Sequence, residues 1–131
     1  MADEVRELLP LPVPSTEIDD VWLKDSAGAV TVGFEYGEDE PRVDGLRFIR
    51  PRAYRHRAES HCTAWHLEAY DRIVEIVDSS WVAELRQAMP IDMRHLFEMR
   101  HFMSYFDSFG CYEVVAQAWS PLSERDRDGQ H

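Results

Sequence analysis

The chain has 131 residues, of which 44% are hydrophobic, and its four Trp, five Tyr and six Phe supply enough apolar surface for one domain with its own core. It contains no run of eighteen apolar residues and no basic-then-apolar leader, so we expect a cytoplasmic protein that neither spans a membrane nor is secreted. A formal net charge of −11 disfavours nucleic acid and anionic membranes as partners and favours a basic protein.

Two residue types add to this picture. Cys62 and Cys111 fit reduced thiols better than a disulfide framework, which agrees with a cytoplasmic location. Thirteen of the fourteen basic residues are Arg and only Lys24 is Lys, a skew that indicates a GC-rich bacterial genome rather than a binding signal.

The first part of the chain predicts an arm, a short helix and a strand. We expect residues 1–16 to form an N-terminal arm, with helical turns in MADEVRELLP followed by an extended Pro-rich segment. The stretch STEIDDVWLKD predicts a short helix capped by Ser15 or Thr16. After the turn SAG, residues 29–37 alternate apolar and polar side chains, which predicts a half-buried strand.

The middle of the chain predicts three more strands and a helix. VDGLRFIR continues the alternation, and Pro51 should then lie at an edge or a bend of the sheet. From Tyr54 to about Glu68 the pattern favours a strand that runs straight past Glu59. DRIVEIVDSSWVAELRQAM fits either one long helix or a strand followed by a short helix. The β-branched IVEIV and the capping sequence DSS favour the second, with the helix ending before Pro90.

The C-terminal part predicts an antiparallel β-hairpin, in which HFMSYF and CYEVVAQAW flank the turn DSFG. Residues 121–131 are polar and predict a disordered tail. Residues 1–120 therefore predict a single α+β domain: a mostly antiparallel sheet of five to six strands, with one or two helices packed on one face.

Three histidines spaced five apart, His56, His61 and His66, suggest a metal site at first sight. On a straight strand, however, His61 faces away from the other two, and zinc needs three or four converging ligands. We therefore expect that these histidines bind no metal and form hydrogen bonds instead. The alternative is a metal site in which His101 joins these three, and it requires the chain to bend near Glu59.

Nucleophilic catalysis has one candidate pair. His101 and Asp107 precede Cys111 along the C-terminal hairpin, so a Cys111–His101 pair across the loop is conceivable. Cys62 and His61 are adjacent and would point to opposite faces of a strand. No GxSxG, HExxH, P-loop or GxGxxG motif is present, and we expect no cofactor. A small enzyme or metal-binding domain using these side chains is the alternative to a non-catalytic protein.

Basic side chains gather in residues 42–57, whereas residues 1–41 hold eleven acidic residues and two basic ones. Guanidinium groups pair bidentately with carboxylate and phosphate, so a small anionic ligand could bind here, with Arg47 and Arg52 as candidate ligands. The competing interpretation is a solvated face of the sheet that balances the acidic turn before it. The six arginines of this Arg cluster are Arg42, Arg47, Arg50, Arg52, Arg55 and Arg57.

A candidate protein-binding surface lies on the last predicted strand. Alternation places Glu113, Gln117 and Trp119 on one face, and Trp119 is expected to be exposed. An exposed aromatic side chain beside acidic and polar groups suits a surface that binds a basic protein.

The order DRIVEIVDSSW, WVAEL and then HFMSYFDSFGCYEVVAQAW resembles small bacterial immunity proteins and related uncharacterised domains. The resemblance covers roughly the C-terminal half and rests on this general pattern, so it carries over no individual residue. It implies a small, acidic, cytoplasmic protein that neutralises a toxin by binding it. We therefore predict a non-catalytic binding protein for a basic protein partner.

Overall fold

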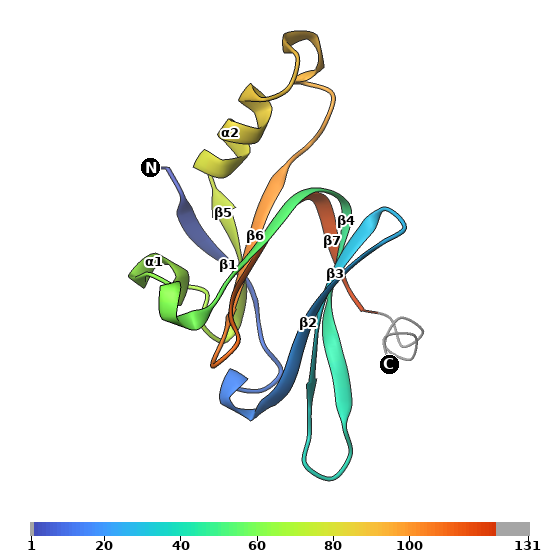
Figure 1. Cartoon of the computed structure of the whole chain (residues 1–131), viewed down its shortest axis with the longest axis vertical. Helices are drawn as coiled ribbons and strands as arrows, with labels where there is room; N and C mark the ends of the chain where they lie inside the picture. The colour runs from blue at the N-terminus through green and yellow to red at the C-terminus, as the bar shows by residue number, and fades with distance from the viewer. Residues whose placement is uncertain (1, 123–131) are drawn as a thin grey trace.

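The computed structural model describes residues 2–122, and antiparallel strands make up most of that range. The strands are β1 (Glu4–Pro10), β2 (Ile18–Ser26), β3 (Ala29–Tyr36), β4 (Arg42–Arg57), β5 (Arg72–Val77), β6 (Arg100–Phe106) and β7 (Gly110–Pro121). They form a seven-stranded sheet in the order β1-β5-β6-β7-β4-β3-β2 (Figure 1). The same range contains the helices α1 (Ala64–Leu67) and α2 (Ser80–Gln87), so a mostly antiparallel α+β fold with a C-terminal hairpin is confirmed, with more strands than expected.

One additional strand comes from the N-terminal segment, where helical turns were expected. β1 pairs with the edge of β5, from Glu4 opposite Val77 to Pro10 opposite Arg72. The Arg6 guanidinium also reaches the Glu75 carboxylate on β5, at 2.7 Å. The local pattern allowed a helix, and the pairing partner that selects a strand lies about seventy residues away in the chain.

The other additional strand is β2, which replaces the expected short helix. Only Ser15–Glu17 winds into a 3-10 turn. Ala27 and Gly28 both have positive φ, 50° and 77°, and the residues on either side of them pair with each other. Two such central residues make a type I′ turn, the connection that matches the twist of two antiparallel strands. The turn therefore requires a strand on both sides, and β3 confirms the one predicted after it.

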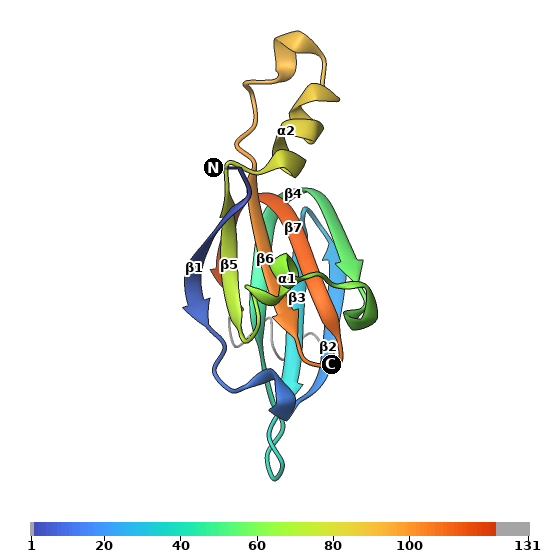
Figure 2. The ribbon, with the colours of Figure 1, turned by 90° about the vertical axis from the view of Figure 1, so that its left-hand side faces the viewer.

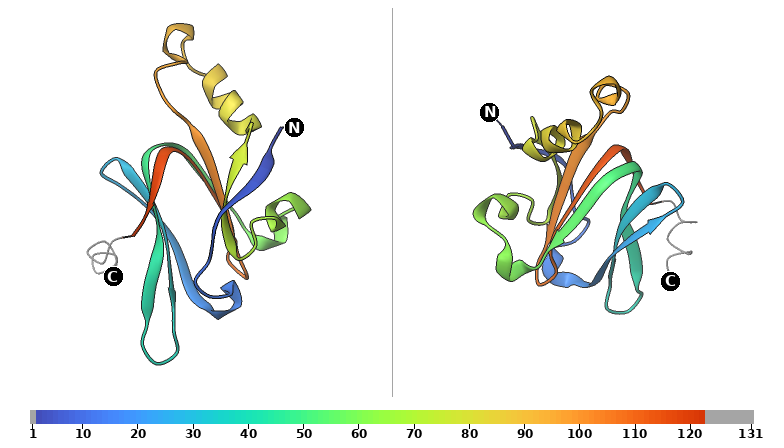
Figure 3. Two further views of the ribbon diagram at one scale, coloured as in Figure 1. Left: turned by 180° about the vertical axis from the view of Figure 1, so that it is seen from behind. Right: turned by 45° about the horizontal axis from the view of Figure 1, so that its top comes forward.

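The long strand β4 changes neighbours midway. It pairs with β3 only as far as Ile49 and continues beside β7 alone, so Pro51 lies where one side of the strand has no neighbour. A bulge between Pro51 and Ala53 accompanies this change. The prediction that Pro51 lies at an edge or a bend is confirmed. Figure 1 shows β4 and β7 arching together, and Figure 3 shows the same arch from two further directions.

After Arg57 the chain turns away from the sheet. A 3-10 turn at Glu59–His61 leads to Thr63, which caps α1. The expected straight strand from residue 54 to residue 68 is therefore wrong. The bend has a tertiary cause, because the β6–β7 turn lies against the end of β4: a Cβ on Gly110 would approach the Arg57 carbonyl oxygen to 2.2 Å.

Two hydrophobic clusters lie on opposite faces of β5, β6 and β7. Inside the arch, Phe34 contacts Phe106 and Phe48 contacts Phe102, with ring centroids 5.6 and 5.2 Å apart. On the other face, α1 covers the second cluster. Strands buried on both faces need apolar side chains at successive positions, which explains the runs RIVEIV and HFMSYF. The second cluster contains Ala69, Val74, Ile76, Met103, Tyr105 and Cys111.

The strand β5 followed by the helix α2 confirms the strand-then-helix interpretation of DRIVEIVDSSWVAELRQAM. Figure 2 shows α2 and the segment after it projecting beyond the end of the sheet. We call residues 88–98 the arm, which is a different segment from the N-terminal arm expected for residues 1–16. The arm contains a 3-10 turn at Ile91–Met93 and returns the chain to β6. Within residues 2–122, no helix is long and apolar enough to cross a membrane.

The C-terminal end of the described chain belongs to the sheet. Pro121 pairs with Leu46 on β4, and the buried Leu122 side chain lies close to Gly45 on the same strand. The disordered tail predicted from residue 121 onward therefore falls mainly on residues 123–131, which lie outside the described residues.

Candidate functional site

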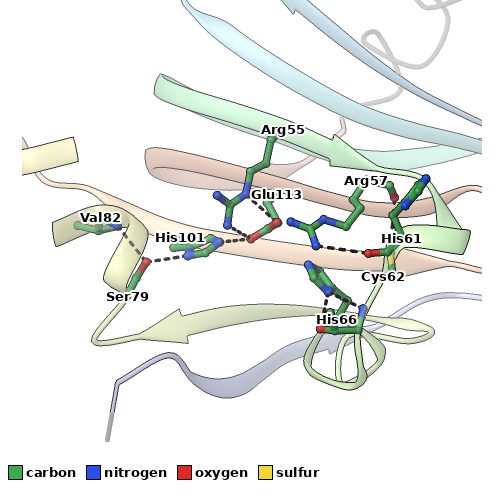
Figure 4. Close-up of polar contacts among 10 residues, drawn as sticks. Arg55, Arg57, His61, Cys62, His66, Ser79, Val82, His101 and Glu113 are labelled. Carbon is green, nitrogen blue, oxygen red and sulfur yellow. Dashed lines mark hydrogen bonds and ion pairs between the residues drawn. The ribbon is translucent and has the colours of Figure 1, made fainter. Parts of the chain in front are cut away.

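A buried carboxylate on β7 is the centre of a polar cluster. The Glu113 side chain is 2% exposed. Its two oxygens accept a bidentate pair from Arg55 on β4, at 2.8 and 3.0 Å, and Oε1 also accepts from His101 Nε2 on β6, at 2.8 Å (Figure 4). Three adjacent strands thus hold one carboxylate between two donor side chains.

His101 extends this cluster to helix α2. Its Nδ1 lies 2.7 Å from Oγ of Ser79, the N-cap residue of the helix, and that oxygen accepts the Val82 backbone N–H at 3.1 Å. Because an ionised Glu113 only accepts, His101 Nε2 donates to it, and Nδ1 shares the second hydrogen bond of the ring with the Ser79 hydroxyl. One hydrogen-bonded chain therefore joins α2 to β6, β7 and β4.

The ionised state of Glu113 results from two opposing effects. Burial raises its pKa, but the hydrogen bonds donated by His101 and Arg55 outweigh burial and lower the pKa to about 2. Arg55 in turn lies 3.9 Å from the ring centroid of Trp81, a cation–π contact that fixes the guanidinium. The cluster is therefore charged, paired and closed by an aromatic side chain.

The order Ser79, His101, Glu113 raises the question of nucleophilic catalysis. The Ser79 hydroxyl is held between two partners, since it is hydrogen-bonded to His101 Nδ1 and accepts the Val82 N–H at the start of α2. Arg55 pairs with the carboxylate that would otherwise stabilise a protonated imidazole. This geometry favours a structural role, in which the hydrogen bonds from Ser79 through His101 to Glu113 anchor α2 on the sheet.

Beside this row of hydrogen bonds, the described residues contain one group of three side chains that could together hold a metal ion. The three are His66, Cys111 and Glu113, and their ligand atoms lie within 4.8 Å of one another. All three are buried. Burial lowers the pKa of His66 and raises the pKa of the Cys111 thiol well above its usual range. Both shifts keep these two groups uncharged.

The hydrogen bonds of this trio do not fit a metal. The Thr63 backbone N–H donates to His66 Nδ1 at 3.0 Å, so Nδ1 keeps its lone pair and the ring proton is on Nε2. Metal-bound histidines show the reverse pattern, with the second nitrogen donating to an acceptor. Both oxygens of Glu113 are already bound by cations or donors. The trio is therefore a hydrogen-bonded cluster in this geometry.

The histidines proposed as an alternative metal site are dispersed. His56 is exposed, with Nε2 2.7 Å from the Phe109 carbonyl oxygen, and His61 is exposed on the turn after β4. Only His66 and His101 approach a common residue, Glu113. The chain does bend at Glu59–His61, but the bend brings His66, rather than His56 and His61 together, to the buried cluster.

The proposed Cys111–His101 pair is not formed across the hairpin. Cys111 lies opposite Tyr105, whereas His101 lies opposite Val115, nearer the other end of the two strands. Asp107 is at the turn, where its carboxylate accepts the Tyr70 hydroxyl at 3.1 Å. The two positions do not flank the loop as the sequence suggested, because His101 lies near the start of β6 whereas Cys111 follows the turn at its end.

The Arg cluster is spread along β4, and its side chains have separate partners. Arg47 is exposed, as expected for a solvated face of the sheet. Arg52 lies 3.7 Å from the ring centroid of Phe97, and Arg55 binds Glu113. Arg57 donates to the His61 carbonyl at 3.3 Å. The structure does not gather these guanidinium groups around one anion.

The face predicted for Glu113, Gln117 and Trp119 is not an open surface. Glu113 is buried, and Gln117 and Trp119 are half-buried. Trp119 pairs with Phe48 and packs against the core inside the arch, so its expected exposure is not observed. The bend shared by β4 and β7 breaks the simple alternation from which that face was drawn.

Exposed apolar side chains gather on the arm instead. Ile91 is 77% exposed, Leu96 65% and Met93 38%. Ordinary surfaces scatter such residues singly, whereas here three fall within six residues at the projecting end of the molecule (Figure 2).

Sequence reasoning recognised DSS, which contains Ser79, as a helix-capping sequence and His101 as a candidate, but it placed Glu113 on the surface. The signal for burial was an acid within the apolar run CYEVV, opposite another run, HFMSYF, that contains a histidine at its start. Glu75 within RIVEIV has the same context and is likewise buried, paired with Arg6 and Arg100. An acid inside an apolar strand predicts a buried partner of opposite charge.

Comparison with known proteins adds no assignment: the chain matches no family model, no curated protein and no solved structure.

Proposed function

We propose that this chain is a non-catalytic acidic binding protein that engages a basic protein partner, as an immunity protein engages the toxin it neutralises. The observation that carries this proposal is the arm, which presents Ile91, Met93 and Leu96 to solvent at the projecting end of the molecule. Clustered apolar anchors within a polar surface are the usual centre of a protein–protein interface.

The arm is held in shape from within, so its apolar side chains are presented by an ordered segment. Arg94 donates to the carbonyl groups of Gln87 and Met89 at the C-terminal end of α2, at 3.0 and 3.1 Å. Arg86 donates to the Arg94 carbonyl at 2.6 Å. These bonds satisfy helix-end carbonyls and reduce the conformational entropy that binding would otherwise cost.

The charge of the chain selects the class of partner. With 25 acidic and 14 basic residues, the molecule attracts a positively charged surface and repels an acidic one. The partner we propose is therefore a basic protein with an apolar recess that accepts the arm.

Capture experiments with three forms of the chain as bait test this proposal in the native host. The forms are the wild type, the double variant Ile91→Ser/Leu96→Ser, and Leu67→Ser, which removes a leucine that is 51% exposed on α1. We expect the wild type and Leu67→Ser to retain the same basic protein, and the arm variant to bind it at least roughly tenfold more weakly in a purified assay.

Two results would contradict the proposal. One is that no basic protein distinguishes the arm variant from the Leu67→Ser control. The other is that the wild type forms a dimer in sedimentation equilibrium that the arm variant does not form, which would make the arm a contact between two copies of this chain.

A further inference from the structure

A cavity of about 380 Å³ lies between α2 and the adjoining ends of β5 and β6, and His101 lines both this cavity and a smaller one bordered by Trp81. We propose that this cavity binds a small organic anion, a carboxylate or a phosphate ester, through Arg6, Arg86 and Arg100. The inference is independent of the partner proposed for the arm.

The three arginines approach the cavity from three elements, β1, α2 and β6. Arg100 donates two N–H groups to Glu75, at 2.9 Å each, and Arg6 donates one. Arg86 donates one to the neutral Arg94 carbonyl. Because a guanidinium carries five N–H groups, each arginine keeps donors beyond these bonds.

Charge in the cavity is opposite to that of the chain as a whole. Three arginines face two carboxylates, Glu75 and Asp78, among the lining residues. Glu75 already shares its charge between two arginines, and its pKa is lowered mainly by the hydrogen bonds from Arg100. An anion would be drawn to this part of an otherwise acidic molecule.

The remaining walls define the rest of the ligand. Several apolar side chains line the cavity, so an anion with a small apolar body fits better than a bare ion. Sites for small molecules generally combine an apolar lining with a few placed polar groups, in volumes from about 300 Å³ upward. The apolar lining residues are Ile76, Val77, Val82, Ala83 and Met99.

Titration with benzoate and with phenyl phosphate, followed by amide chemical shifts, tests the inference on the whole chain. The two probes share a ring and differ in the anionic group, so they distinguish carboxylate from phosphate recognition. We expect saturable shifts at Val82, Ala83 and His101 with a dissociation constant of about 1 mM or tighter for at least one probe. Sodium chloride at matched ionic strength controls for screening.

Four variants make the test specific. Arg86→Gln and Arg100→Gln should each weaken binding at least roughly tenfold, because each removes charge-assisted donors. Arg94→Gln loosens the arm from α2 but leaves the cavity charges in place, and Arg47→Gln removes an exposed arginine of β4; both should bind as the wild type does. A fifth variant, Glu75→Gln, should tighten binding, since it removes the carboxylate that competes for Arg6 and Arg100.

The inference is overturned if neither probe produces saturable shifts at the cavity. It is also overturned if Arg47→Gln or Arg94→Gln weakens binding as much as Arg86→Gln and Arg100→Gln do, because binding would then follow general charge or arm order rather than the cavity.

Discussion

At the residue scale, Glu113 shows how a charged group is kept inside this protein. A lone carboxylate in an apolar environment would become protonated, but Arg55 and His101 both donate to it. The cost of burying the charge is offset only while both partners are present. Removing the charge of Glu113 should therefore lower the free energy of unfolding much more than removing a charge from the surface.

Glu113→Gln is expected to lower the free energy of unfolding at pH 7 by about 3–5 kcal/mol, because it leaves Arg55 without its counter-ion and weakens the acceptor for His101. Urea denaturation measures this. Glu40→Gln, in the exposed turn between β3 and β4, is the matched control and should change stability by less than about 0.5 kcal/mol.

The same variant carries a pH signature. The folded-state pKa of Glu113, about 2, lies below the ordinary value of 4.5, so its ionisation stabilises the fold above pH 4.5 and that contribution is lost as the pH falls towards 2. The stability difference between wild type and Glu113→Gln should therefore shrink across this window. A constant difference from pH 6 to pH 2 would show that the charge of Glu113 is not what stabilises the fold.

At the element scale, turns and tight contacts decide where strands end. Gly110, at the start of β7, has φ of +95°, and its backbone lies against the end of β4. Gly28, in the β2–β3 turn, has φ of +77° with open space around it. Both positions favour glycine for its backbone freedom, but only Gly110 also lacks room for a Cβ.

Gly110→Ala should therefore destabilise the protein by more than Gly28→Ala, for which backbone strain alone costs about 1–2 kcal/mol. At Gly110 the new Cβ meets the Arg57 carbonyl oxygen, so β4 and the β6–β7 turn must move apart. Thermal or urea unfolding of the two variants measures the difference. Equal destabilisation would mean that the contact between the turn and β4 does not constrain the fold.

Elements were predictable where their signal is local. The hairpin HFMSYFDSFGCYEVVAQAW contains its own turn and both partners, and the N-cap Ser79 marks the start of α2. β1 was not predictable in this way, because EVRELLP becomes a strand only by pairing with β5. The bend after β4 was missed for the same reason, since the element that requires it is the distant β6–β7 turn.

At the scale of the whole molecule, the sheet has a centre and two edges of different character. β6 and β7 are paired on both sides and buried on both faces, whereas β1 and β2 are the edge strands. The arm projects beyond the sheet. Local opening should therefore cost most free energy at the centre and least in the arm.

Amide hydrogen exchange should follow this order. We expect the slowest exchange at Phe102, Met103, Val114 and Val115, faster exchange along β1 and β2, and the fastest in residues 88–98. Exchange in β1 as slow as that in β6 would contradict this order and would show that the N-terminal strand unfolds only with the whole domain.

The candidate site followed the same division as the fold. Sequence reasoning selected His66, His101, Cys111 and Glu113 individually, because the residue type alone identifies a possible ligand, acid, base or nucleophile. It did not place them in one cluster, since that required the register of β6 against β7 and the return of α1 over the sheet. It also did not find Arg6, Arg86 and Arg100 as a group, because three separate elements bring them to one cavity.

The amino-acid sequence by itself determined the antiparallel α+β class, the C-terminal hairpin, the strand and helix around Ser79, and the acidic net charge. Each of these depends on periodicity, turn residues or composition, which act locally or sum over the chain. Tertiary structure alone decided the strand identity of β1 and β2, the arch of β4 and β7, the burial of Glu113 and the exposure of the arm. These depend on pairing and packing between residues far apart in the chain. A local sequence pattern does not reveal the free energy of such long-range contacts.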